Sequence, residues 1–381
     1  MRLPHVTIVL RDRVIPCGDL IIGAGHIAEI TETDGTPSHT VFPGFVDMHG
    51  DMIELELEPR VQVDFPMAVA LNHLDARLAA SGVTTAYAGV SFSRAAKYGE
   101  RRSFDHTCAI IRALKAAQAD MRVDHRVHAR FDITFTAAID ALEGLLRYGM
   151  VDLVSVMDHT PGQGQYRNIE RHIELRAEHH KVTLAEARAM VQAKIDAATP
   201  EAEVLTNLQT VSRLCADHGI ALASHDDDSV AKGHLMADLG AVISEFPVSL
   251  EAAQTVAERG LMVAMGAPNA MRGQSYSGNL SARDAHAAGI LHILAADYHP
   301  AAILPAVRAL AATDPDGLPG AVRLAATNPA KALALSDRGE IATGKRADLA
   351  VVDANDRVVM TIKAGGPDPQ RRHLCPLGPM T

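Results

Sequence analysis

The chain has 381 residues, of which 48% are hydrophobic and 22% are charged, a composition that supports a sizeable core and excludes disorder and collagen-like repeats. Its net charge of −10, from 36 Lys and Arg against 46 Asp and Glu, argues against nucleic acid and anionic membranes as partners. Histidine is unusually frequent, since 19 His outnumber the eight Phe and six Tyr together. This excess of His, in a chain also rich in Asp, directs attention to metal sites.

Cysteine spacing and hydropathy bear on where in the cell we expect the protein to be. The four Cys residues lie far apart, which predicts neither a disulfide framework nor a thiolate zinc site. Arg11, Asp12 and Arg13 interrupt the first apolar run too early for a signal peptide. No apolar stretch approaches the roughly 20 residues of a membrane span. We therefore expect a cytoplasmic protein without a membrane partner.

The two ends of the chain share one pattern. Short β-branched runs separated by Gly turns occur at 5–10, 14–16 and 20–30, and the same pattern returns in 339–366. Because both segments read as short strands, we expect them to form a single unit.

Between the ends, short apolar runs alternate with helical patterns, as in repeated β/α units. Eight runs qualify as strands: 41–51, 83–90, 123–133, 151–159, 220–227, 241–249, 261–269 and 289–298. The helical patterns lie at 66–80, 104–119, 138–148, 170–198, 201–217 and 301–312. Eight strands with intervening helices predict an α/β fold of the (β/α)8 TIM-barrel type. A doubly wound open sheet is the alternative, but no strand is followed by a GxGxxG or P-loop turn.

Side chains that can bind metal stand at the ends of six of these strands. They are His49 and Asp51 on the first strand, His128 and Asp132 on the third, then His159, His225, Glu245 and Asp297 on the fourth, fifth, sixth and eighth. Each alone is explained by an ordinary capping or turn residue. A barrel gathers all strand ends at one mouth, so together they favour a divalent metal site.

Phosphate-binding side chains are also concentrated near the predicted mouth. The segment MRGQSYSGN after strand seven combines an Arg with small residues whose backbone N–H groups can surround an anion. The candidates are Arg272, Ser275, Ser277 and Asn279 in or beside this segment, with Arg60, Arg130 and Arg167 elsewhere. A plain surface turn is the alternative for the segment, and neutralisation by a barrel carboxylate such as Asp47 is the alternative for Arg130.

Several motifs resemble the amidohydrolase superfamily: PGFVDMHGD at the first strand, a lone Asp297 at the eighth, and GEIATGKRADLAVVD near the C-terminus. The motifs MDHTPGQGQYR, EFPVSLEAA, MGAPNAMRGQSYSGNLSARD and ADYHP are similar to its branch of alpha-D-ribose 1-methylphosphonate 5-triphosphate diphosphatases, from phosphonate metabolism. The resemblance spans essentially the whole chain. It implies a β-sandwich domain from residues 1–42 and 330–381 beside a metal-dependent hydrolase barrel of residues 43–329.

The resemblance also implies a role for each site residue. One metal would be held by His49, Asp51 and Asp297, a second by His159 and His225 with Asp132 bridging, and Glu245 and His128 would support these ligands. The ions would be zinc, manganese or iron, and Asp297 would also act as the catalytic base. The branch tends to have Glu where this chain has Asp132, and its Pro-Arg-Pro-Gly segment is shortened here to Pro59-Arg60.

The implied reaction is hydrolysis of the α–β phosphoanhydride of a small phosphorylated sugar by a metal-bound hydroxide, with release of pyrophosphate. Two alternatives remain open at this point. One is a related hydrolase that opens a cyclic amide or deaminates a heterocycle, and the other is a catalytically silent binding or assembly protein. The segment 170–198 is consistent with either a lid over the mouth or a contact surface in a homo-oligomer.

Overall fold

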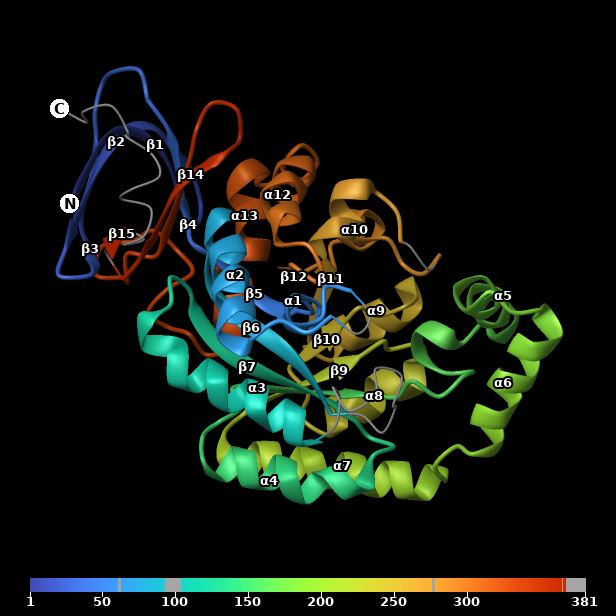
Figure 1. Ribbon diagram of the computed structural model, residues 1–381. Helices are drawn as coiled ribbons and strands as arrows, with labels where there is room; N and C mark the ends of the chain where they lie inside the picture. Colours follow the sequence, from blue (N-terminus) through green and yellow to red (C-terminus); the bar gives the residue numbers. More distant parts are fainter. Residues whose placement is uncertain (61–62, 93–103, 276–277, 365, 368–381) are drawn as a thin grey trace.

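The computed structural model describes residues 1–60, 63–92, 104–275, 278–364 and 366–367, which form two separate sheets (Figure 1). One is an eight-stranded parallel sheet in which each strand pairs with the next along the chain. Its strands are β5 (Phe45–Gly50), β6 (Val83–Phe92), β7 (Asp124–Asp132), β8 (Leu153–Met157), β9 (Ala221–His225), β10 (Ile243–Glu245), β11 (Met262–Gly266) and β12 (Ile293–Ala295). The fold is thus the (β/α)8 barrel that the sequence predicts.

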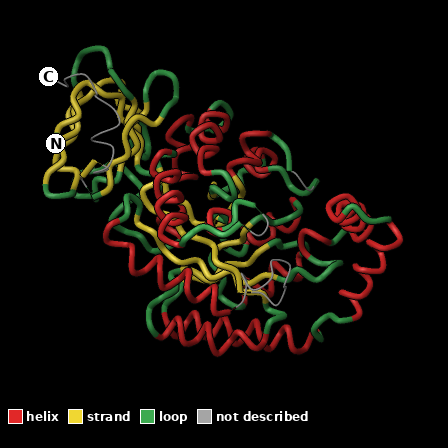
Figure 2. The backbone as a smooth tube through the Cα atoms, in the orientation of Figure 1, coloured by secondary structure: helices red, strands yellow, loops and turns green. Residues whose placement is uncertain are grey.

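Helices surround this sheet, as the red and yellow segments of Figure 2 show. Their bounds are α1 (Ile53–Leu57), α2 (Met67–Ala80), α3 (Phe104–Ala117), α4 (Ile139–Arg147), α5 (Ile169–His180), α6 (Leu184–Asp196), α7 (Glu201–His218), α8 (Val230–Asp238), α9 (Leu250–Glu258), α10 (Ala267–Arg272), α11 (Ala282–Ala287), α12 (Ile303–Ala311), α13 (Gly317–Ala325) and α14 (Thr327–Ala332). In the part of the chain that the structure describes, no helix is both long and apolar enough to cross a membrane.

The barrel closes at the mouth, where the first and last strands meet. The backbone N–H of Asp51 donates to the carbonyl of Asp297 at 2.8 Å, and the N–H of Asp297 donates to the carbonyl of His49 at 2.9 Å. Gly50 and Asp297 form an isolated parallel bridge at the same level. These bonds hold the ends of β5 and β12 together and so fix three predicted site residues next to one another.

Strand periodicity places an apolar layer directly below the polar mouth. Residues two apart on a strand share a face. Ala223 and His225 on β9 are therefore on the same face, and their register partners on β10 are Ile243 and Glu245. The apolar members belong to one buried cluster, whose residues on the barrel strands are Val46, Met48, Tyr87, Leu153, Ala223, Ile243, Ala264, Ile293 and Ala295. This layer fills the barrel beneath the site and excludes water from its floor.

The second sheet is built from both ends of the chain, which confirms that they form one unit (Figure 1). Its strand order is β15-β14-β13-β4-β1-β2-β3, with bounds β1 (Arg2–Val9), β2 (Val14–Gly23), β3 (His26–Glu32), β4 (Thr40–Pro43), β13 (Leu349–Val352), β14 (Val358–Lys363) and β15 (Gly366–Pro367). It has its own buried cluster, which includes Ile8, Leu20, Ile27 and Ile362. Its other apolar residues, among them Phe42, Ala350 and Val352, pack with the barrel core and so hold the sheet beside the barrel.

Two predicted segments are divided in the structure. The strand predicted for 41–51 breaks at Gly44, so β4 joins the terminal sheet and β5 begins the barrel. The helix predicted for 170–198 breaks at Lys181, which takes a left-handed conformation with φ of +54°. Thr183 then begins α6 with a capping box in which Glu186 participates. The segment is therefore a helical hairpin, which projects from the barrel in Figure 1.

Candidate metal centre

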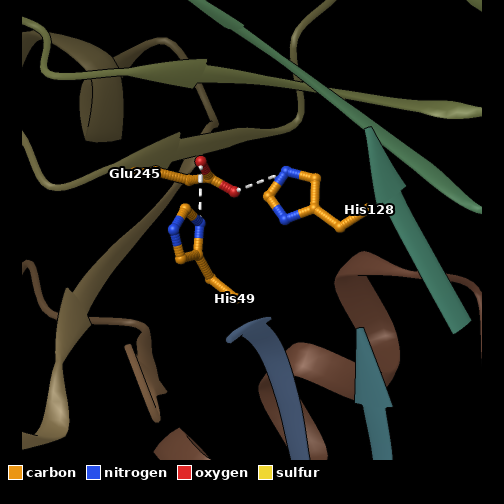
Figure 3. Close-up of side chains that lie close together, drawn as sticks. All are labelled: His49, His128 and Glu245. Carbon is orange, nitrogen blue, oxygen red and sulfur yellow. Dashed lines mark ion pairs between the residues drawn. The ribbon is translucent and has the colours of Figure 1, made fainter. Parts of the chain in front are cut away.

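His49, His128 and Glu245 form the floor of the barrel mouth, and all three are fully buried (Figure 3). Nδ1 of His49 lies 3.1 Å from one carboxylate oxygen of Glu245, and Nε2 of His128 lies 3.5 Å from the other. The three residues come from β5, β7 and β10, so only barrel closure can bring them together. Their ligand atoms lie within 4.8 Å of one another.

This cluster fits a divalent cation because several of its buried polar atoms are unsatisfied. Among the described residues, both ring nitrogens of His49, Nδ1 of His128 and Oε1 of Glu245 are buried without a hydrogen-bond partner. The short contacts between them are close in distance but poorly aligned as hydrogen bonds. Leaving such groups unsatisfied is costly, and two imidazoles with a carboxylate are a ligand set for zinc, manganese or iron.

The three side chains of the floor strongly affect one another's protonation. Burial favours neutral Glu245, but the neighbouring His49 and His128 hold the pKa of its carboxyl well below the ordinary value. For His49, burial opposes protonation, yet the charges of Glu245 and Asp51 raise its pKa to about 10. Burial lowers the pKa of His128 to about 3. In the metal-free protein the floor therefore favours an ionised Glu245 and a proton on His49 rather than on His128.

A second group of ligand-type side chains lies beside the floor. The ligand atoms of His159, His225 and Asp226 lie within 4.8 Å of one another. Nδ1 of His225 contacts Glu245 at 2.9 Å, so Glu245 joins this group to the floor. The rings of His49 and His225 are stacked with centroids 5.4 Å apart. The two groups are thus adjacent, an arrangement that suits either one ion or a pair.

Asp51, Arg130 and Asp297 line the side of the mouth. One guanidinium nitrogen of Arg130 lies 2.6 Å from Asp51, whose same oxygen lies 3.3 Å from His49. Burial would raise the pKa of Asp51, but Arg130 and His49 hold it well below the usual range. Burial, followed by the charge of Asp51, raises the pKa of Asp297 to about 6. Asp51 is consequently a permanent anion, whereas Asp297 is able to exchange a proton near neutral pH.

Backbone strain marks the same strand ends. Asp226, Phe246 and Asp297 each follow a barrel strand with φ of +52°, +54° and +56°. Residues other than Gly rarely adopt such angles, and they persist where surrounding contacts hold them. Here the positive φ angles turn the chain at the mouth, directly after β9 and β10 and two residues after β12.

A cavity of about 450 Å³ opens above these groups. Predicted site residues that line it are His49, Asp51, Arg130, His225, Arg272, Ser275, Asn279 and Asp297. Arg272 is the last residue of α10 rather than part of a loop, and Gly273 ends the helix in a left-handed conformation. The cavity thus places two guanidinium groups within reach of the carboxylates and imidazoles, which gives it the chemistry of an anion site next to a metal site.

The remaining predicted residues lie elsewhere. Asp132 is in neither ligand group of the described residues, and its carboxylate accepts hydrogen bonds from the N–H and hydroxyl of Thr134 at 3.0 and 2.6 Å. Arg60 lines a neighbouring cavity of about 510 Å³ that shares Asp51, Arg130 and Asp297 with the first. Arg167 lines a third cavity. Ser277 lies outside the described residues.

Asp226 is the residue that sequence reasoning did not select. It directly follows His225, in a run of three Asp residues at 226–228 that is a visible signal. Its carboxylate lies 3.6 Å from Nε2 of His225, and burial raises its pKa. Gln165, Asn269 and Tyr298 also line the cavity, and nothing in their sequence context distinguishes them.

Comparison with known sequences identifies a family and a relative. The Amidohydrolase family profile matches residues 40–367. The chain is 35% identical over 370 residues to alpha-D-ribose 1-methylphosphonate 5-triphosphate diphosphatase from Escherichia coli (strain K12), covering 93% of this chain and 96% of that protein.

Solved structures agree in fold at low identity. N-acetyl-D-glucosamine-6-phosphate deacetylase from Mycobacterium smegmatis aligns with a TM-score of 0.64 at 16% identity, covering 97% of this chain and 99% of that chain. 5-methylcytosine deaminase from Klebsiella pneumoniae aligns with a TM-score of 0.66 at 15% identity, covering 96% and 97%. With the family profile extending over most of its length and a metal-type ligand set at the mouth of its barrel, the chain belongs to the amidohydrolase family of hydrolases.

Proposed function

We propose that this hydrolase cleaves the α–β phosphoanhydride of alpha-D-ribose 1-methylphosphonate 5-triphosphate, giving the 5-phosphate and pyrophosphate. The observation that carries the proposal is that Arg130 and Arg272 line the same cavity as His49, His225 and Asp297. A triphosphate needs cationic groups beside the reacting phosphorus, and the planar guanidinium matches phosphate oxygens. The 35% identical diphosphatase of Escherichia coli supports the choice of substrate.

Two sets of side chains would hold divalent metal. The resemblance assigns a first ion to His49, Asp51 and Asp297, and these side chains line the cavity next to the group of His49, His128 and Glu245. His159, His225 and Asp226 would form the second set, and His225 joins the two through Glu245. Asp226 adds a carboxylate beside His159 and His225, and Glu245 lies between the two groups, where the resemblance implies Asp132 as the bridge. When bound, a divalent ion lowers the pKa of water toward ~7 and neutralises charge on the transferring phosphoryl group.

Asp297 is the proposed proton acceptor. Its pKa of about 6 leaves it mostly ionised at neutral pH, yet close enough to neutrality to take up the proton of an attacking water. The backbone bonds to His49 and Asp51 hold it at the rim of the cavity. Asp51, whose pKa is depressed, keeps its negative charge throughout and pairs with Arg130.

The two arginines have different proposed tasks. Arg130 is mostly buried and already paired with Asp51, so it positions that carboxylate and contributes positive charge to the cavity wall. Arg272 is exposed at the end of α10 and can turn toward a ligand. Arg272 is therefore the proposed direct contact for a phosphoryl oxygen.

Phosphorus NMR tests the proposal directly. Metal-reconstituted protein is given the ribose triphosphate and, in parallel, a nucleoside triphosphate. Pyrophosphate released from the first substrate, and much more slowly from the second, is the expected result. If neither substrate releases pyrophosphate while metal is demonstrably bound, the proposed reaction is wrong and cyclic amides and deamination are tested next.

Substitution of Arg272 separates the proposed reaction from the amide alternative. A neutral ring substrate has no use for a guanidinium at the mouth, whereas a triphosphate does. Arg272→Ala should lower kcat/KM for the triphosphate by about tenfold to a hundredfold, the loss expected for one charge-assisted hydrogen bond. A cyclic amide turned over equally well by both proteins would instead support the alternative.

The proposal also includes the setting of the reaction. Its partner would be a small phosphorylated molecule, and its place the cytoplasm. Assembly into a homo-oligomer stays a prediction from the sequence, to be checked by light scattering.

A further inference from the structure

A second cavity of about 310 Å³ adjoins the metal-site cavity and is lined mainly by basic side chains. Gln165 and Asn279 line both cavities, so the two are neighbours. The basic members are Arg167, Arg171, His172, Arg176, His179 and His180. Gly278 and Asn279, from the chain that follows α10, also line this cavity. We call this space the α5 pocket.

The sequence of α5 separates its charges by face. Residues 168, 171, 172, 175, 176, 179 and 180 line the α5 pocket, at the spacing of three and four that defines one helix face. The acidic residues Glu170, Glu174 and Glu178 recur every four positions and do not line it. A helix that is nearly balanced in charge thus turns its cations toward the cavity and its carboxylates away from it.

Contacts with α6 fix this orientation. Ile173 and Ala177 of α5 pack against Ala187 and Val191 of α6 in a small buried cluster of the hairpin. Both guanidinium nitrogens of Arg188 contact Glu170, at 2.7 and 2.6 Å. Because the apolar stripe packs against α6, the basic face is left for the pocket, and the exposed Arg188–Glu170 pair contributes little to this orientation.

Arg176 and Arg171 of the α5 pocket each contact a neighbouring side chain of α5. Nε of Arg176 donates to the ring of His172 at 3.1 Å, which holds that guanidinium on the pocket wall. Arg171 pairs with Glu174 at 2.9 Å, but both side chains are more than half exposed. Such a surface pair is weak, so Arg171 can exchange Glu174 for a more highly charged anion.

A row of rings joins the α5 pocket to the metal centre. The ring of Tyr166 lies 6.2 Å from that of His159 and 4.2 Å from that of His172. The turn that includes Tyr166 is anchored at Gly164, whose N–H donates to Asp228 at 2.7 Å. The basic pocket is therefore held at a constant place relative to the predicted metal ligands.

We infer that the α5 pocket binds the terminal diphosphate of the substrate and holds it as the leaving group, an inference that rests on the proposed function. In this step the water oxygen forms a bond to the α-phosphorus and the bond from that phosphorus to the α–β bridging oxygen breaks. The electron pair leaves with pyrophosphate, and the water proton goes to Asp297. The metal-site cavity carries Asp51, Asp226 and Asp297, so a highly charged leaving group is better placed beside Arg171 and Arg176.

Pyrophosphate binding to the metal-loaded protein tests the inference without requiring turnover. Calorimetric titration is performed on wild type, on the double variant Arg171→Gln/Arg176→Gln, and on Arg188→Gln. Arg188 is the matched control, because it lies on the same hairpin but faces Glu170 instead of the pocket. We expect the double variant to bind pyrophosphate at least about tenfold more weakly and the control to match wild type.

Further readouts distinguish binding from folding and from the reaction itself. A double variant to Lys should recover most of the affinity, since it keeps both charges, and melting temperatures report any loss of structure. KM for the triphosphate should rise in the Gln variant, while the control keeps its value. Equal pyrophosphate affinity in wild type and the Gln variant overturns the inference, even if the triphosphate is hydrolysed. If pyrophosphate binding depends on these arginines but no triphosphate is hydrolysed, the inferred pyrophosphate site is supported and the proposed reaction is wrong.

Discussion

His49 is held between two carboxylates, and this sets its protonation in the metal-free protein. Burial opposes the charged ring, but Glu245 and Asp51 raise its pKa to about 10. Because the pKa of His49 is raised in the folded state, its protonation stabilises the metal-free protein. This stabilisation is complete at pH values below the ordinary pKa of 6.5 and is lost as pH rises through about 10. Metal must displace this proton to use either ring nitrogen as a ligand.

Metal affinity should therefore depend steeply on pH. Between pH 7 and 9 we expect the apparent affinity for Mn²⁺ to increase by about tenfold per pH unit, because one proton leaves for each ion bound. Competition with a chelator of known affinity at several pH values measures this slope. Affinity that stays constant over the same range would show that His49 carries no proton to displace.

Asp297→Asn tests the proton acceptor on the rim of the cavity. The amide keeps the shape of the side chain but removes its basicity, so kcat should fall by roughly 10²- to 10⁴-fold. Metal content is measured in the same preparation, since Asp297 is also a predicted ligand. Asp238→Asn, which alters an exposed carboxylate paired with Arg259, is the control and should leave kcat unchanged. Turnover within tenfold of wild type at full metal content would exclude Asp297 as the base.

At the scale of elements, Gly44 separates the two sheets. A Cβ atom at this position would lie 2.3 Å from Oγ1 and 2.4 Å from Cγ2 of Thr84 on β6. Gly44 also donates its N–H to the carbonyl of Asp348 at 2.8 Å, which links β5 to the start of β13. The division of the predicted strand 41–51 thus follows from a close approach that only Gly permits.

Gly44→Ala should lower the free energy of unfolding by about 1–3 kcal/mol, the usual cost of overpacking a tight site. Gly144→Ala is the matched control, because no atom lies within 4 Å of its added Cβ and the residue is inside α4. This second change should stabilise the protein by roughly 0.4–1 kcal/mol. Urea unfolding measures both values. Equal stability of the two variants would contradict the close contact at Thr84.

The hairpin of α5 and α6 shows what helical periodicity can and cannot predict. Periodicity indicates helix over 170–198, and the structure places two helices there. The break between them depends on Lys181, which adopts a left-handed conformation. A Gly at this position would have indicated the end of a helix, but a Lys does not. His179 and His180 are exposed, and they line the α5 pocket because α6 fixes the rotation of the helix.

At the scale of the whole molecule, Arg338 joins the barrel to the terminal sheet. Its guanidinium contacts Thr85 at 2.9 Å and Asp124 at 2.7 Å on the barrel, and lies 3.8 Å from Asp348 beside β13. The side chain is 5% exposed, so its loss would remove a buried cation from the interface, where Arg126 and Arg346 also pair with Asp124 and Asp348. Charge thus adds to the apolar packing by which Phe42, Ala350 and Val352 of the terminal sheet join the barrel core.

Arg338→Met should destabilise the protein by about 1–3 kcal/mol, since it keeps most of the volume but removes buried charge-assisted hydrogen bonds to Thr85 and Asp124. Arg147→Met, which removes an exposed pair with Glu143 four residues away, should cost less than about 0.5 kcal/mol. Thermal and urea unfolding of the two variants provide the comparison. If both variants unfold alike, Arg338 does not hold the two sheets together.

Strand order and strand-end chemistry follow from the sequence because they depend on local spacing. Alternation along each strand places His225 two residues beyond Ala223, and a closed barrel carries every such residue to one mouth. Tertiary structure alone decides which of these side chains meet. Asp132 accepts hydrogen bonds from Thr134, whereas Asp226 lies beside His225. Glu245 pairs with histidines from other strands, since such contacts depend on long-range packing that no local pattern contains.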